Sequence, residues 1–454
     1  MSANSQALID FAADVAAAGR DRADDVEVWA VRGTSHSFRI ENRRIFPRME
    51  SQKVRIGLRI LRDGGLGYAA LMRLDREEAR RALDKALQTL RPTPLTAFGP
   101  CTPGVGRTPC DERLAALRGR PAEQLDLARR LRDRVFEEAG EQLGSLSGSV
   151  SLDIDELAVA TRAGAADLSA TALTAFAEAD SVFYDTFWAT GWRDDWSELT
   201  ELGVRTWREA SRPAAAPEDL GLASGTVDVV LHPRLLESLV RTLGSDKFSG
   251  SARLAGLSEL QSGVEVADPS ITLVDDASAS AGLLVRPVDD EGTPCRRHVL
   301  IDGGRFSGFL HDRSSAIRAG VEPTGHGYRR PLLAEDLQEA PVRERLSQLS
   351  MEPGARSLAE LLGELGSGLL VYDLLGLHTA DRSRAAFSCA VFCGFTIEGG
   401  RVERRLAPGR WNLSGSLFDV PGGGAGFLRD VRLSRERVRT GTAELPYVVT
   451  RLNL

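Results

Sequence analysis

The stretch KVRIGLRILRDGGLGYAALM, residues 53–72, alternates apolar and polar side chains on both sides of a glycine-containing turn. Successive side chains of a β-strand point to opposite faces, so this pattern is typical of two strands joined in an antiparallel hairpin. Two preceding stretches, DVEVWAVRG (25–33) and HSFRIENRRIFPRME (36–50), have the same character. Because Gly and Asn turns separate the runs, the three predict an antiparallel meander.

The rest of the chain continues this mixture of helices and short strands. The first half is expected to contain helices at 75–90, 121–140 and about 193–211, a loop at 91–112 and more antiparallel strands at 147–190. Asp75 is placed to cap the first of these helices, and Pro121 and Gly140 mark the two ends of the second. The second half is mostly short strands with glycine turns, plus helices near 233–243 and 357–366.

Pro and small residues gather in SRPAAAPEDLGLASG (211–225), which is the best candidate for a domain boundary. No βαβ rhythm is present. The sequence therefore predicts an α+β protein of two domains, residues 1–212 and 222–454, each built on mainly antiparallel sheet with flanking helices.

Composition excludes several classes of function. A chain of 454 residues with net charge −7 is an unsuitable main partner for nucleic acid. No apolar run approaches 18 residues, so no membrane span is expected, and the N-terminus lacks the basic start of a signal peptide. Five cysteines without CxxC spacing are typical of reduced thiols, which places the expected protein in the cytoplasm.

The most specific segment is RPVDDEGTPCRRHVLIDGGRFSGFLHDRSSA (286–316). It predicts an acidic turn, a strand, a tight turn at Gly303-Gly304 and a return strand. Taken alone, Asp289, Asp290 and Glu291 are best explained as a capped, solvated turn. The order of the pieces is more specific than their composition.

This segment resembles the TldD/PmbA (TldE) family, in which a DDEG-type turn precedes a hairpin and then a segment of the pattern D..tA...G..sTGn..R. Matching pieces follow the family's order along nearly the whole chain: GLRILRDGGLGYA (57–69), DRSSAIRAGVEPTGHGYR (312–329), EPGARSLAELLGELGSGLLVYDLLGLHTADRSRAAFS (352–388) and GFTIEGGRVERRL (394–406). The resemblance implies a pair of homologous subunits. The TldD-type chain carries a zinc-protease HExxxH helix and a later Cys, and the TldE/PmbA-type chain lacks them.

The resemblance also assigns the place where zinc ligands would stand. VDVVL (227–231) resembles the strand that enters the metal helix. Counting forward, Arg241 falls at the first ligand, Thr242 at the general base and Asp246 at the second ligand. An arginine stays protonated and repels a cation, and without the base no metal-bound water is activated. The segment 418–433 has no cysteine. We therefore expect no catalytic residue and no metal in this chain, with zinc in a partner subunit.

The helix itself offers a second pair that might suggest a metal site, His232 and Glu237. Pro233 favours the first helical turn, so His232 is expected at the cap position rather than inside the helix. One apolar stripe then runs along the helix up to Gly244, which is expected to end it; its members are Leu235, Leu236, Leu239, Val240 and Leu243. The pattern indicates an ordinary packing helix.

Peptide binding is expected elsewhere. His326 and Arg329 belong to PTGHGYR, where the family has a Gly-Asn type turn that lines the cleft. Glycines beside His326 would let a ligand approach the backbone, and Arg329 would hold a peptide carboxylate. With the DDEG acids, this gives the substrate-cleft candidates Asp289, Asp290, Glu291, His326 and Arg329.

Two weaker metal hypotheses remain open. His298 and His311 lie on the two arms of one hairpin and with Asp312 would make an unorthodox metal site. Cys389 and Cys393 share one strand face, but no His or acid lies beside them at ligand spacing.

The resemblance implies a non-catalytic TldE/PmbA-like subunit of a heterodimeric zinc metalloprotease. Such a pair degrades or trims unstructured peptides, and matures some ribosomally made peptides or natural products. The partner would be a TldD-like zinc subunit, and no activity is expected of this chain alone. Two alternatives stay open: a stand-alone protein that binds a peptide or small molecule, and an enzyme with a metal at His298 and His311.

Overall fold

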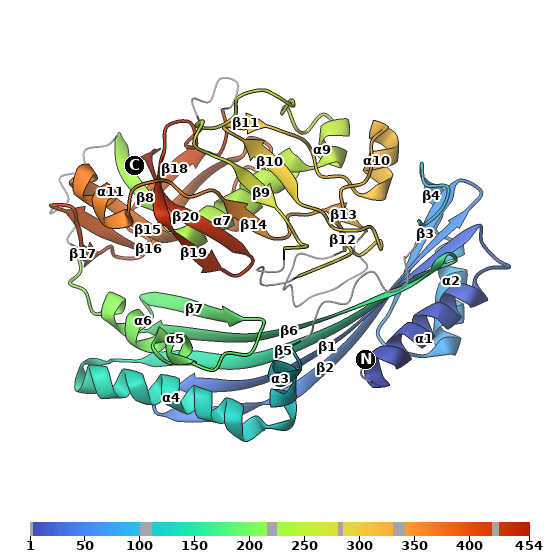
Figure 1. Cartoon of the computed structure of the whole chain (residues 1–454), viewed down its shortest axis with the longest axis horizontal. Coiled ribbons are helices and arrows are strands. Elements are labelled where there is room, and N and C mark those ends of the chain that lie inside the picture. The colour runs from blue at the N-terminus through green and yellow to red at the C-terminus, as the bar shows by residue number, and fades with distance from the viewer. Residues whose placement is uncertain (1–2, 100–110, 216–224, 280–284, 330–340, 420–425) are drawn as a thin grey trace.

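The two predicted domains are present, each built around a mainly antiparallel sheet with helices beside it (Figure 1). The structure, a computed structural model, describes residues 3–99, 111–215, 225–279, 285–329, 341–419 and 426–454. The α+β prediction is confirmed. The expected division between 212 and 222 falls between helix α6 (Leu202–Ala210) and strand β8 (Thr226–Leu231), and residues 216–224 lie outside the described part of the chain.

Seven strands form the first sheet, in the order β4-β3-β2-β1-β5-β6-β7, with every neighbouring pair antiparallel. They are β1 (Asp25–Glu41), β2 (Arg44–Arg62), β3 (Gly65–Leu71), β4 (Arg91–Pro92), β5 (Leu146–Thr161), β6 (Gly164–Ala179) and β7 (Phe183–Ala189). The meander is confirmed, but the break expected between 33 and 36 is wrong. Gly33 lies inside β1, paired with Lys53 of β2 and Asp155 of β5, and an added Cβ would lie 2.9 Å from the Asp155 carboxylate. The chain turns instead at Asn42, with φ 52°.

Helices cover one face of this sheet, from α1 and α2 at one end to α4 and α6 at the other. The helices of the domain are α1 (Ala3–Ala18), α2 (Arg76–Leu87), α3 (Glu112–Ala115), α4 (Pro121–Ala139), α5 (Ser197–Thr200) and α6. As predicted, Asp75 caps α2 by accepting the amides of Glu77 and Glu78, and Gly140 ends α4 with φ 57°.

The alternation along β1 sends its side chains to two different cores. Val28 and Ala30 pack under α1 and α2. Trp29 and Val31 belong to a separate buried cluster on the opposite face. Glu27 shares that opposite face and pairs with a residue of the second domain. One face of the sheet is therefore helix-covered, and the other is turned toward the second domain.

Eleven strands form the second sheet. They are β8, β9 (Leu273–Asp275), β10 (His298–Asp302), β11 (Arg305–Phe306), β14 (Leu349–Met351), β15 (Ser367–Leu375), β16 (Ala386–Glu398), β17 (Arg401–Arg405), β18 (Asn412–Ser416), β19 (Arg432–Thr440) and β20 (Ala443–Asn453). β20 pairs with both β18 and β8, so β8, β15, β16, β18 and β20 close into a ring. The β8–β15 and β14–β20 pairs are parallel. A separate two-stranded antiparallel sheet pairs β12 (Gly327–Tyr328) with β13 (Arg343–Glu344).

The predicted metal-like helix packs against this ring. It begins as α7 (Pro233–Leu239), and its predicted leucine stripe is fully buried. The end expected at Gly244 is wrong: the chain continues through a π-helical turn into α8 (Ser245–Phe248). A glycine is needed at 244 because the Phe248 ring would lie 2.9 Å from an added Cβ. The other helices are α9 (Gly250–Leu254), α10 (Arg313–Ala319) and α11 (Leu358–Leu365), which lies where a helix was predicted.

The two domains share one apolar cluster. Phe183 and Phe187 of β7 belong to it together with Val230 of β8, Phe395 of β16 and Val449 of β20. Burial of such side chains on both sides holds the domains against each other. No helix of the described residues is long and apolar enough to cross a membrane.

Candidate functional site

The start of α7 is decided by His232, as the sequence predicted. Its Nδ1 accepts the amide of Arg234 at 3.2 Å, which makes His232 the helix cap. Its ring stacks on Tyr372 with centroids 4.0 Å apart, and burial holds its pKa well below the ordinary value. A neutral, stacked cap is a structural histidine.

Arg241 occupies the position assigned to the first zinc ligand, and every arm of its guanidinium is used. It donates to the Glu237 carboxylate at 2.8 Å, to the carbonyl oxygens of Leu346 (3.1 Å) and Ser347 (2.8 Å), and to the Thr442 hydroxyl at 2.5 Å. These partners belong to α7, to the chain entering β14 and to the β19–β20 turn. Arg241 therefore ties three segments together with a fixed positive charge where a cation would have to bind.

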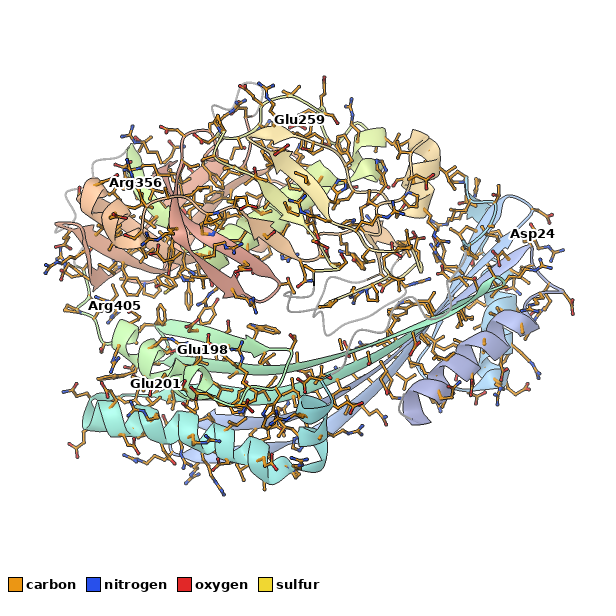
Figure 2. All side chains as sticks on the ribbon, viewed as in Figure 1. Asp24, Glu198, Glu201, Glu259, Arg356 and Arg405 are labelled. Carbon is orange, nitrogen blue, oxygen red and sulfur yellow. The ribbon has the colours of Figure 1, made fainter. Side chains whose placement is uncertain are left out.

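The other two positions do not favour a metal either. The Asp246 carboxylate pairs with Arg382 at 2.9 Å near the surface, and Thr242, half-buried, has no carboxylate to offer. Lys247, beside Asp246, is buried and donates to Glu259 at the rim of the domain (Figure 2). Among the described residues, no group of three or more His, Cys, Asp or Glu is arranged to hold a metal ion. The residues at the assigned positions do not fit zinc.

The DDEG turn is capped as the residues predict, but it is buried rather than solvated. Asp289 accepts three backbone amides, those of Glu291, Thr293 and Gly327, each at 2.9 Å. None of the three acids is more than 1% exposed. Asp290 accepts the Arg329 amide at 2.7 Å and pairs with Arg286 at 3.1 Å. The turn thus fastens β12 to the rest of the second domain.

A chain of buried ion pairs continues from this turn into the first domain. Glu291 pairs with Arg59 of β2 at 2.7 Å, and Arg59 pairs with Glu27 of β1 at 2.6 Å. Glu27 also accepts a hydrogen bond from the Arg329 guanidinium. Gly57 leaves room for that guanidinium, whose Nη1 would lie 3.0 Å from an added Cβ. Two carboxylates and two guanidiniums therefore alternate across the domain interface.

We call these four residues (Glu27, Arg59, Glu291 and Arg329) the interdomain ion cluster. The electrostatics favour the charged forms of Glu27 and Arg59, whereas burial lowers the pKa of Arg329. Burial raises the pKa of Glu27, but the neighbouring Arg59 and Arg329 outweigh it and hold the pKa below its usual value. Burial lowers the pKa of Arg59, and Glu27 and Glu291 more than restore it. Such a buried cluster is stable only while every member has its partner.

The predicted cleft residue His326 is also buried. Its Nδ1 lies 3.0 Å from both the carbonyl and the hydroxyl of Thr324, and its Nε2 lies 3.5 Å from the Asp275 carboxylate. The His298 ring stands edge-on to it at 5.8 Å. His311 instead bonds Ser315 at 3.1 Å. The histidine that meets His298 in a ring contact is therefore His326.

The substrate-cleft role of Asp289, Asp290, Glu291, His326 and Arg329 stays a prediction. All five side chains are buried in the second domain, and only Glu291 and Arg329 among them bond to described residues of the first domain. For Arg329 to hold a peptide carboxylate, it would have to leave Glu27.

Cys389 and Cys393 are buried free thiols on β16, and burial raises the pKa of each.

Sequence reasoning missed the first-domain half of the cluster. In DVEVWAV, Glu27 is two residues before Trp29 and four before Val31, so the three side chains share one face of the strand, and the other two are apolar. Arg59 has a similar place in GLRILR. A charged residue on an otherwise apolar strand face is expected to be buried and to need an oppositely charged partner. The position of Glu27 among apolar residues was the sequence signal that could have indicated such a partner.

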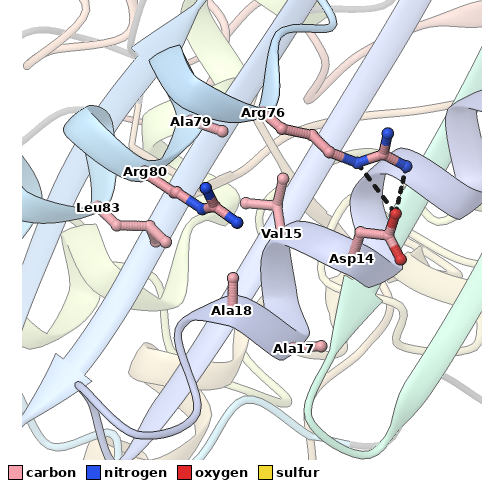
Figure 3. Close-up of a pocket in the computed structure, with 8 residues that line it drawn as sticks. All are labelled: Asp14, Val15, Ala17, Ala18, Arg76, Ala79, Arg80 and Leu83. Atoms are coloured by element: carbon pink, nitrogen blue, oxygen red, sulfur yellow. Dashed lines mark hydrogen bonds and ion pairs between the residues drawn. The ribbon is translucent and has the colours of Figure 1, made fainter.

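Two of the pockets formed by described residues lie outside the interdomain ion cluster. One of about 320 Å³ lies between α1 and α2, where Arg76 pairs with Asp14 (Figure 3) and Arg80 pairs with Glu77. Its arginines are already neutralised. The other, of about 180 Å³, is lined by residues of β14, β19 and β20.

The contribution of Asp289, Asp312 and His326 to the free energy of unfolding is expected to fall as pH rises from about 5 to about 8. Burial and the adjacent Glu291 raise the pKa of Asp289 from 3.8 to about 8, and burial raises that of Asp312 to about 7. The pKa of His326 is also raised, by Asp275 against burial. In each case the folded chain holds a proton that the unfolded chain has released, so unfolding becomes easier as pH rises through this window. Urea unfolding between pH 5 and 8.5 measures the slope. Asp289→Asn should flatten it, and an unchanged slope would contradict the assignment.

Two models of one protein family match this chain. The model for the PmbA/TldA metallopeptidase C-terminal domain matches residues 224–451, and the model for domain 1 of the same family matches residues 26–90. A metalloprotease of Methanocaldococcus jannaschii is 29% identical over 158 residues, which are 35% of this chain and 33% of that protein. A metalloprotease of Methanothermobacter thermautotrophicus is 25% identical over 238 residues, 52% of this chain and 49% of that protein. The match thus spans a third to a half of these relatives.

A solved structure extends the likeness of the fold to the whole chain. TldE from Thermococcus kodakarensis superposes with a TM-score of 0.79, covering 97% of this chain and 98% of that one, at 20% sequence identity.

Proposed function

Because this chain belongs to the PmbA/TldD metallopeptidase family, we propose that it is a non-catalytic, TldE-like subunit of a heterodimeric zinc metalloprotease. The pair would degrade or trim unstructured peptides, with zinc and the catalytic base on a TldD-like partner. The observation that carries the proposal is Arg241, whose guanidinium occupies the first ligand position and is bonded to Glu237 and to the carbonyls of Leu346 and Ser347.

Association with a homologous, zinc-bearing chain would explain why this chain keeps the family fold although its own ligand positions are substituted. Two homologous subunits can meet about a pseudo-twofold axis, so each keeps the surface while one loses the ligands. A stable interface of this kind buries about 2,000 Å² or more and is largely apolar.

Exposed apolar side chains support a protein partner. Four of the eight large apolar side chains exposed among the described residues lie on or just after the neighbouring helices α9 and α10: Leu254, Leu257, Ile317 and Val321. They are between 46% and 61% exposed. Grouped exposure of this kind is typical of protein interfaces.

The test is co-expression with a TldD-like chain that carries HExxxH, followed by size-exclusion chromatography and metal analysis. We expect one peak containing both chains, peptide hydrolysis by the pair, and about one zinc per pair. Two separate monomer peaks at micromolar concentration would contradict the heterodimer and favour a stand-alone binding protein. About one tightly held zinc in the isolated chain would overturn the non-catalytic role. Substitution of His298 and His311 would then locate that metal.

A further inference from the structure

We propose that the outer edge of β19 holds an extended peptide, and that it favours a peptide with acidic side chains at alternate positions. This inference rests on the proposed peptide-binding function and assigns it a place and a substrate class.

The edge is available because β19 is paired on one side only. Its last residues pair with β20, from Arg437↔Pro446 to Thr440↔Ala443. Within the described ranges, no other strand pairs with residues 437–440. Alternate residues of an antiparallel strand direct their N–H and C=O away from the paired neighbour, so this edge presents backbone groups that an added strand can bond.

Its charge selects the kind of peptide. Arg437 and Arg439 are exposed and, being two residues apart, project from the same face of the strand. The Arg437 guanidinium lies 3.5 Å from the Glu444 carboxylate, whereas no carboxylate of a described residue lies within 4 Å of the Arg439 guanidinium. In an added strand, every second side chain would stand opposite these arginines. Asp or Glu at positions i and i+2 would therefore complement them.

The location fits a substrate path between the domains. Strand β19 contacts β7 of the first domain, and Figure 1 shows it on the side of the second domain that is turned toward the first. Both arginines also line the pocket of about 180 Å³, together with Gln348 and Ser350. The Asp276 carboxylate in that pocket accepts the amide and hydroxyl of Ser278, so it is committed to its own turn. The pocket gives a bound side chain room beside the arginines.

The arginines have a simpler explanation, which the test must separate from binding. Charged residues on a sheet edge prevent edge-to-edge aggregation without binding anything specific. Under that explanation, any acidic peptide would bind weakly, through overall charge alone.

The experiment measures binding of fluorescein-labelled eight-residue peptides to the full chain by fluorescence anisotropy. One peptide has Glu at alternate positions, and its analogue has Gln there. We expect the Glu peptide to bind about tenfold more tightly, from two half-exposed ion pairs, and the preference to shrink with added salt. Arg437→Gln with Arg439→Gln should abolish the preference. The matched control is Arg401→Gln with Arg410→Gln, which removes two exposed arginines elsewhere and should retain it.

A second arm tests the backbone contact. The Glu peptide is N-methylated in two versions, each at one alternate set of amides. Strand pairing predicts that one version loses most of its affinity and the other does not. Equal affinity of the two versions, equal binding of Glu and Gln peptides, or an equal loss in the control variant would each overturn the inference. If the co-purified pair still hydrolyses peptides in those cases, the proposed function stands. If no peptide is bound or hydrolysed, both fail.

Discussion

Replacing Glu27 by Gln is expected to lower the free energy of unfolding by about 3–5 kcal/mol, the range for breaking a buried ion pair. Glu27 is fully buried and accepts hydrogen bonds from Arg59 and Arg329. Gln keeps the shape but removes the charge that Arg59 and Arg329 share, so Arg59 would keep Glu291 as its ion-pair partner and Arg329 would lose the carboxylate of Glu27. Urea unfolding followed by tryptophan fluorescence measures the loss, because Trp29 lies beneath the Arg329 guanidinium.

The matched control is Glu41→Gln on the same strand. Glu41 also pairs with an arginine, Arg39 at 2.7 Å, but both side chains are about half exposed. An exposed pair contributes about 1 kcal/mol or less. A loss in Glu27→Gln as small as that of the control would show that the cluster does not hold the domains together. A double substitution with Arg329→Gln should recover part of the loss, because the pair is coupled.

Replacing Arg241 by Met is expected to destabilise the chain by about 2–4 kcal/mol, since charge-assisted bonds contribute about 1.5–3 kcal/mol each and water can replace part of them at a quarter-exposed side chain. The carbonyls of Leu346 and Ser347, both in buried residues, would lose the donor that Arg241 provides. Thermal or urea unfolding measures the effect. Zinc content should not change, because removing the arginine supplies no ligand.

Arg382→Met serves as the control for that substitution. Arg382 pairs with Asp246 at 2.9 Å, with both side chains about half exposed. Its loss should cost about 1 kcal/mol or less. If Arg241→Met is equally mild, the guanidinium does not tie α7 to β14 and the β19–β20 turn. If Arg241→Met gains zinc, the arginine was masking a metal site and the proposed function must be revised.

The fold was accessible to sequence reasoning because local signals agreed with the tertiary structure. Period-two alternation in 25–72 marks the meander, Asp75 and Pro121 mark helix starts, and Gly140 marks a helix end. Each of these sequence signals depends only on a few residues that are neighbours along the chain. The two errors concern glycines that were taken as breaks. Gly33 lies beside Asp155 of another strand, and Gly244 lies beside Phe248 one helical turn on and Leu417 far along the chain, so each glycine makes room for a side chain inside a continuing element.

The candidate site divides in the same way. That Arg241 cannot bind a cation follows from the residue type alone, since a guanidinium keeps its proton in any fold. The position of His232 as the cap of α7 was also predictable, because Pro233 follows it and proline favours the first helical position. The burial of the DDEG acids depends on tertiary packing. So do the contacts of Glu291 with Arg59 and of Arg329 with Glu27, which join residues more than 200 positions apart in the chain. The free energy of a charge depends on the partners and the water around it, and both are set by packing between domains rather than by neighbours in sequence.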